Sequence, residues 1–418
     1  MAYANRVAGG VPVPGPSTAP RALLPLYVVV FVGFLGYSLM ITVFTPMLLH
    51  GHAMLPESAS ASYRSVVLGG ILSLYPFGQF IGSPVQGALS DRFGRRPVLL
   101  ASLSVTTFCY AIIAFSLAAG SVKLLALGLV IAGLAEANIV IAQAAISDVI
   151  AAAERNRYFG YIYMSASLAY VVGPLGGGKL ADPRLVSWFS DATPFWCMFA
   201  LLAATAAAVL FRFRETMRAG PPPTTIRLFD NILSLGLVFT RPGLRRFFLT
   251  NFLIYLAIFG FFRAYPMYLV GQFQLGVSAM SEFVAWVGVP IVLVNLGLTG
   301  FLSRHVPLKA LTVCSAAATG LLAASVVAPR TTTLLWPLLF LTAGALAACL
   351  PSCATLLSQA AGEREQGQVM GDNQALQVAA EAVSGLMSGL LAAMLVKLPL
   401  IVFGGIAVGA ALVAALAL

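Results

Sequence analysis

The chain has 418 residues, of which 60% are hydrophobic and only 9% charged, and its mean hydropathy is +0.93. Soluble globular proteins have an apolar fraction nearer ~45–50%, so this composition excludes them and indicates a polytopic membrane protein. The net charge of +10 does not indicate nucleic-acid binding, because the basic residues lie in loops beside apolar segments and form no patterned basic face. The five cysteines all lie inside apolar runs and predict no disulfide framework.

Twelve apolar segments are long enough to cross a hydrocarbon core of ~30 Å. The first six are predicted at 23–48, 65–88, 97–118, 122–146, 158–181 and 193–213, and the second six at 246–271, 280–302, 307–328, 333–357, 370–396 and 398–418. We therefore expect an all-α fold. Its predicted parts are a disordered cytoplasmic tail (1–22), a six-helix bundle (23–213), a cytoplasmic linker (214–245) and a second six-helix bundle (246–418). Most Lys and Arg residues fall in the loops at one end of these segments, so the positive-inside rule predicts that both termini are cytoplasmic.

A short polar turn joins the second and third segments. It reads GALSDRFGRRP from Gly87 to Pro97 and carries four charges in six residues. Gly94 suits the positive φ that a tight reversal requires, and Asp91 is placed to cap a helix or to pair with an arginine. The stretch Gly300–Pro307, about 213 positions later, is a degraded copy of this turn and indicates a duplication.

The turn resembles the loop between helices two and three of the major facilitator superfamily, whose pattern is G, x, L, small, D, R/K, x, G, R/K, R/K; every defined position matches. The resemblance implies twelve transmembrane helices in two pseudo-symmetric halves and transport of a small molecule by alternating access. It further implies a monomer without a cofactor or metal, in the inner membrane of a bacterium.

Segment five contains a glycine and proline motif that includes Gly173, Pro174 and Gly177. It is similar to the motif G-x8-G-x3-GP-x2-GG in helix five of the drug:proton antiporters of this superfamily, except that Ala169 replaces one glycine. The resemblance implies export and, with Gly87 and Gly94 of the turn, positions where helices bend or approach closely. Simple small-residue packing is the alternative.

Two acids fall inside predicted spans, where an isolated ionised carboxylate costs a few kcal/mol or more. Glu136 lies in segment four, and Gln143 and Ser147 are predicted to share its helical face. Glu381 lies in segment eleven with Gln377 on the same face. For each acid the sequence leaves two interpretations open: a protonatable group that carries protons or contacts substrate, or a buried polar contact that only joins helices.

Arg263 is the basic residue predicted to lie well inside a span. It requires an anionic partner, and the sequence leaves open whether this is Glu136, Glu381 or an anionic substrate. The alternative is that its side chain extends to the membrane surface.

The resemblance also assigns a gating charge relay to Asp91, Arg92 and Arg95 of the turn and Asp148 at the end of segment four. In the family this network stabilises the outward-facing state. Exposed ion pairs contribute only about 0–1 kcal/mol each, so a gating role requires several of these charges to act together. The alternative is that they only fix the topology.

These observations favour a proton-coupled secondary transporter, an efflux antiporter for a drug or metabolite, whose partners are a small-molecule substrate, protons and the lipid bilayer. One alternative is a proton-coupled importer of an organic anion such as a polycarboxylate or siderophore. Another is a membrane sensor that does not transport. The sequence contains no nucleotide-binding loop, nucleophile constellation or metal-ligand cluster, so we predict no enzyme activity.

Overall fold

The computed structural model describes residues 19–51, 54–136, 138–150, 154–217, 243–298, 301–302, 305–361 and 366–417. Most of the predicted tail and linker, and part of the degraded copy of the turn, lie outside these ranges. The helices before the linker are α1 (Ala19–His50), α2 (Ala61–Phe93), α3 (Arg95–Ala118), α4 (Val122–Ala135), α5 (Asn138–Val149), α6 (Arg155–Leu180) and α7 (Thr193–Arg212). Those after it are α9 (Arg245–Phe273), α10 (Val277–Leu293), the π-helix η1 (Val294–Leu298), α12 (Leu308–Ser325), α13 (Leu335–Ala360), α14 (Gln366–Met394) and α15 (Leu398–Ala417).

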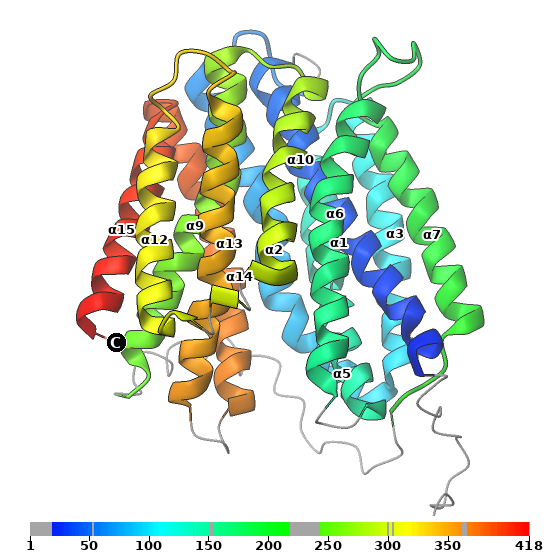
Figure 1. The fold of residues 1–418 in the computed structure, drawn as a ribbon. Helices are drawn as coiled ribbons and strands as arrows, with labels where there is room; N and C mark the ends of the chain where they lie inside the picture. Colours follow the sequence, from blue (N-terminus) through cyan, green and yellow to red (C-terminus); the bar gives the residue numbers. More distant parts are fainter. Residues whose placement is uncertain are drawn as a thin grey trace, which may run out of the picture.

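In the described part of the chain these helices make twelve spans, because α5 continues α4 and η1 continues α10. Eleven of the spans are long and apolar enough to cross a membrane, and α6 is the twelfth by position. Figure 1 shows the two halves side by side, with α2, α10 and α14 between the outer helices of each. The predicted all-α fold of two six-helix halves is confirmed.

The bundle has two distinct ends. We call the end with the α2–α3 turn at Gly94 the turn end, and the end with the loop over residues 181–192 the loop end. In Figure 1 the turn end is at the bottom, and both ends of the described chain lie there.

Each half encloses its own apolar core. The larger cluster of buried hydrophobic residues consists almost entirely of residues before 214. The buried residues of the second cluster all come after residue 253. Within a half, glycines let helix backbones touch: a Cβ added to Gly82 of α2 would lie 2.1 Å from the carbonyl oxygen of Leu134 in α4. Tight packing of this kind holds helices together in a membrane, where lipid competes for apolar surface.

The halves meet through α2 against α14 and α6 against α10. Gly69 and Gly389 approach each other so closely that a Cβ added to Gly69 would lie 2.5 Å from the Cα of Gly389. Nearer the loop end, Lys179 pairs with Glu282 over 2.7 Å. These contacts join the two halves at the loop end.

Segment four differs from its prediction, because the helix is broken. Glu136 has an extended backbone (φ −75°, ψ 109°) between α4 and α5. Serine hydroxyls satisfy the carbonyl groups that the break frees: Ser102 donates to Ala135 over 2.6 Å and Ser83 to Glu136 over 3.4 Å. The predicted single face shared by Glu136, Gln143 and Ser147 is therefore wrong, since it required an unbroken helix.

The polar turn is shorter than the sequence indicates. Here α2 runs to Phe93 and α3 begins at Arg95, so Gly94 alone separates them. Its φ of 100° confirms the positive φ expected at this glycine.

Candidate functional site

Glu136 lies at the break between α4 and α5 and is buried. Its Oε2 accepts a hydrogen bond from the hydroxyl of Tyr75 over 2.8 Å, and its Oε1 accepts one from the amide of Asn138 over 2.8 Å. Both partners belong to the first half. The carboxylate is thus held by two donors of the first half.

Glu381 forms a second buried cluster that joins the two halves. Its Oε1 accepts hydrogen bonds from the hydroxyl of Tyr37 in α1 and from Nη2 of Arg263 in α9, the latter over 3.3 Å. The same Nη2 donates to the hydroxyl of Tyr37 over 2.7 Å. Of the partners that the sequence left open for Arg263, the structure brings it to Glu381.

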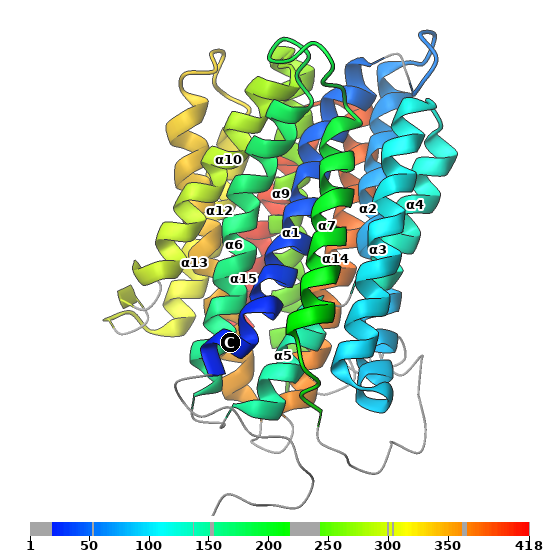
Figure 2. The same cartoon turned by 90° about the vertical axis from the view of Figure 1, so that its right-hand side faces the viewer.

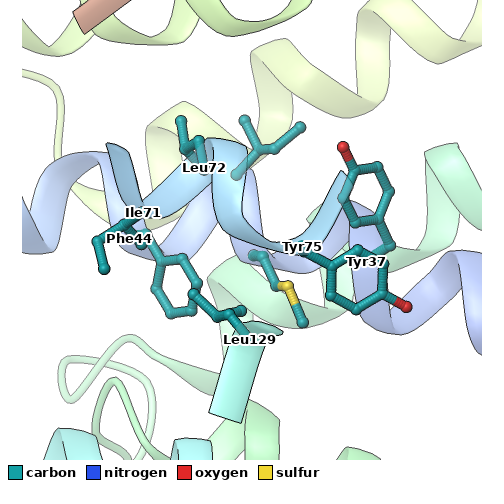
Figure 3. A pocket seen from close by; sticks show the side chains of 8 residues that line it. Tyr37, Phe44, Ile71, Leu72, Tyr75 and Leu129 are labelled. Carbon is teal, nitrogen blue, oxygen red and sulfur yellow. The ribbon is translucent and has the colours of Figure 1, made fainter. Parts of the chain in front are cut away.

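The two clusters are adjacent. The rings of Tyr37 and Tyr75 stack with centroids 5.1 Å apart, and Figure 3 shows the two side chains side by side with their hydroxyls pointing in different directions. A cavity of about 10 Å³ lies beside them, about the size of one water. The remaining residues that line it are Met40, Ile41, Phe44, Ile71, Leu72 and Leu129.

Further glutamines lie between these clusters and the turn end. Gln374 is exposed, although it lies two helical turns from Glu381 on the same face of α14, and Gln377 is half-buried. Gln143 donates to the hydroxyl of Tyr163 over 3.1 Å, and Tyr163 is 54% exposed. The interior face of α14 is therefore accessible toward the turn end and closed at Glu381.

At the turn end, three of the four predicted relay residues come together. Arg95 pairs with Asp91 and, over 3.0 Å, with Asp148. Arg92 does not join them; it is exposed, and its guanidinium lies 5.3 Å from the centroid of the Phe93 ring. Glu215, just after α7, accepts hydrogen bonds from the backbone N–H groups of Arg95 and Arg96 over 2.9 and 3.0 Å. Its negative charge suits the N-terminus of α3.

The glycine motif of α6 contacts α1. A Cβ added to Gly173 would lie 2.1 Å from Oγ of Ser38, and one added to Gly177 would lie 2.8 Å from Cβ of Leu39. Pro174 lies inside α6, which continues through it. Gly87 is less constrained, because its nearest neighbour would be 3.5 Å from an added Cβ.

A family model described as the Major Facilitator Superfamily matches residues 26–384. The chain belongs to the Major Facilitator Superfamily. Its eleven described candidate spans are those of an integral membrane protein.

The chain is similar to tetracycline resistance proteins. It is 36% identical to the class B protein of Escherichia coli over 148 residues, which are 35% of each chain. It is 28% identical to the class E protein of Escherichia coli over 369 residues, covering 84% of this chain and 83% of the relative. The stretches that match the tetracycline resistance proteins of classes B, C and H span 35 to 40% of the length of those proteins.

Solved structures show the same fold. The human organic anion transporter MFSD10 (TETRAN) aligns with a TM-score of 0.70 and 19% identity, covering 94% of this chain and 99% of that chain. A bacterial homologue of the human lysosomal transporter Spinster, in an inward-facing and occupied conformation, aligns with a TM-score of 0.73 and 14% identity, covering 98% and 97%.

Two residues of the site, Tyr37 and Asn138, were not predicted from the sequence. Both were detectable in principle, because a buried tyrosine hydroxyl usually has a hydrogen-bond partner and Asn138 follows a buried acid by two positions. Their partners were not detectable, since Tyr37 reaches a residue 344 positions away.

Proposed function

We propose that this protein is a proton-coupled secondary transporter that exports a small solute by alternating access. One observation carries the proposal: Glu381 of the second half bonds to Tyr37 of the first half, inside the contact that must change when the halves move. The charge state of a carboxylate at that place alters the free energy of the contact. Protonation and the opening of the transporter are then coupled.

The coupling has a physical basis in the partners of Glu381. The ionised acid pairs with Arg263 and accepts the hydroxyl of Tyr37. Protonation removes the charge that compensates the buried arginine. It therefore weakens the contact of Glu381 with Arg263 and Tyr37 and favours a different conformation of the two halves. Glu136 is the second protonatable group, and its donors Tyr75 and Asn138 hold it within the first half.

The described conformation is closed at the loop end. The turn end carries Arg92, Arg95 and Arg96, and by the positive-inside rule it faces the cytoplasm. We infer that both termini are cytoplasmic, that the membrane is the inner membrane of a bacterium, and that this conformation gives the cytoplasm access to the interior face of α14. We further propose that the charge pairs of Asp91, Arg95 and Asp148 rearrange when the turn end closes.

The relatives favour export, because a membrane transporter can confer resistance to tetracycline by lowering the amount of drug inside the cell. A small hydrophobic solute with a positive charge suits two buried acids. We propose that Gln143 and Gln377 add hydrogen bonds to such a solute on its way from the turn end.

Arg263 favours a second candidate, a transporter of organic anions. Its Nε is buried and has no hydrogen-bond partner among the described residues, so the guanidinium retains a donor for a carboxylate. The fold neighbour MFSD10 is an organic anion transporter. In this alternative the anion displaces Glu381 from Arg263.

The test is proton flux in proteoliposomes that contain the purified protein, with tetracycline, tetraphenylphosphonium or citrate added to one side. Export by antiport predicts that a cation drives protons in the opposite direction, and that Glu381→Gln and Glu136→Gln abolish this flux. Glu57→Gln is the control, because Glu57 is exposed in the loop between α1 and α2.

Two results would reject the export proposal. Proton movement in the same direction as citrate, lost in Arg263→Ala, would establish symport of an anion. Solute transport by the unchanged protein without any proton movement would remove the coupling itself.

A further inference from the structure

A groove of about 450 Å³ runs along the outside of the first half near the turn end. It lies between α2 and α3. Its walls are mostly apolar and are formed by Gln86, Leu89 and Phe93 of α2 and by Pro97, Val98, Ala101, Ser102 and Val105 of α3.

The groove exists because of the break in segment four. Above it, α4 packs against both α2 and α3 and fills the space between them. At Ala135 the helix ends, and α5 lies closer to α1 and α6. Figure 2 shows α4 high beside α3 and α5 lower and displaced toward α1. Below α4, the space between α2 and α3 is left as the groove.

The groove opens to the surface that faces lipid. Pro97, Ala101 and Val105 recur every fourth residue on α3 and are all exposed, as is Phe108 one turn beyond them. A row of exposed apolar side chains on a membrane-spanning helix faces lipid chains. An acyl chain is therefore the group available to fill the groove.

The mouth of the groove carries a positive charge. Phe93 forms the last part of the wall, and the guanidinium of Arg92 lies 5.3 Å from the centroid of its ring. Arg95, by contrast, is paired with Asp91 and Asp148. Among the described residues, Arg92 has no carboxylate partner within 4.0 Å, and a guanidinium binds phosphate oxygens in a bidentate manner.

We propose that this groove is a binding site for one anionic phospholipid of the leaflet at the turn end. One acyl chain lies between α2 and α3 along Leu89 and Ala101, and the phosphate group binds Arg92. Arg92, which takes no part in the charge pairs of Arg95, thus recognises the lipid headgroup.

The test is native mass spectrometry of the purified, delipidated protein, titrated with phosphatidylglycerol or with phosphatidylcholine of the same acyl chains. An arginine near the membrane surface contributes about 1 kcal/mol toward an anionic lipid, so we expect about a fivefold preference for phosphatidylglycerol. Arg92→Gln should remove the preference and retain weak binding of both lipids. Ala101→Trp fills the groove and should weaken both.

Each variant has a matched control. Arg157→Gln removes another exposed arginine that lies over an aromatic ring, 6.0 Å from the centroid of Tyr161. Ala118→Trp adds the same ring to an exposed position of α3 far from the groove. Both controls should bind lipid as the unchanged protein does. Arg92→Gln changes an exposed side chain, so it keeps the test valid if Ala101→Trp does not fold.

Two results would overturn the proposal. One is a preference for phosphatidylglycerol that persists in Arg92→Gln, and the other is normal binding of both lipids by folded Ala101→Trp.

Discussion

Gly69→Ala should force the two halves apart at the loop end. A Cβ at this position would lie 2.5 Å from the Cα of Gly389 and 2.7 Å from the carbonyl oxygen of Gly385. Carbon atoms in contact are about 3.5–4.0 Å apart, so α2 and α14 must separate by about 1 Å. The obstructing atoms belong to the backbone of the other half, and no side-chain rotation can relieve the overlap.

The effect on the conformational equilibrium follows from the cost of overpacking. Inserting a methyl group into a well-packed contact costs about 1–3 kcal/mol. The cost falls on the state in which the loop end is closed, because α2 and α14 touch there. The ratio of open to closed molecules at the loop end should therefore rise about 5-fold to 150-fold.

Spin labels on Ser58→Cys and Thr331→Cys measure this equilibrium, because both residues are exposed at the loop end in different halves. The exposed native cysteines Cys197 and Cys314 must first be replaced. Gly69→Ala should shift the distance distribution to longer values. Gly70→Ala, where an added Cβ meets nothing within 4 Å, should leave it unchanged. An unshifted distribution in Gly69→Ala would refute the reasoning.

Three further predictions concern single side chains. Tyr37→Phe removes the hydroxyl that bonds both members of the buried ion pair, so solute-driven proton flux should fall about tenfold or more. The control is Tyr27→Phe, because the hydroxyl of Tyr27 has no hydrogen-bond partner among the described residues; this change should alter the flux less than twofold. Gly94→Ala places a side chain at φ 100° and ψ 156°. This conformation costs about 1–3 kcal/mol, so the thermal midpoint in detergent should fall. Gly160→Ala adds a methyl group at an open helical position and should not lower the midpoint. Burial raises the pKa of Asp191, in the loop before α7, from 3.8 to about 6. Between these pH values the native state binds more protons than the unfolded state, so the stability that this group contributes falls as the pH rises through that window. Asp191→Asn should therefore flatten the decrease in thermal midpoint between pH 4 and pH 6, and an unchanged slope would contradict this prediction.

The sequence was sufficient to predict the spans and the turn, because both depend on local chemistry. An apolar run of span length forms a helix in lipid whatever it packs against. Gly94 was identified because a tight reversal between two helices demands a conformation that glycine adopts easily. The structure extends several helices beyond the predicted boundaries, since charged residues such as Asp91 and Arg92 continue a helix outside the apolar region.

The arrangement of the candidate site was beyond sequence reasoning. The break at Glu136 depends on Ser83 and Ser102 of other helices, which accommodate the freed carbonyl groups. The choice of Glu381 over Glu136 as the partner of Arg263 depends on how the halves pack. Contacts between residues more than a hundred positions apart leave no trace in one sequence without an alignment.

The length of α4 bears on how the chain enters the membrane during synthesis. Its 14 residues rise about 21 Å at 1.5 Å per residue, less than the ~30 Å of the hydrocarbon core. The polar groups at its end therefore need partners before this span is stable in lipid. Ser83 and Ser102 supply them from α2 and α3, which precede it and leave the ribosome first. Chain order thus places both partner helices before the broken span.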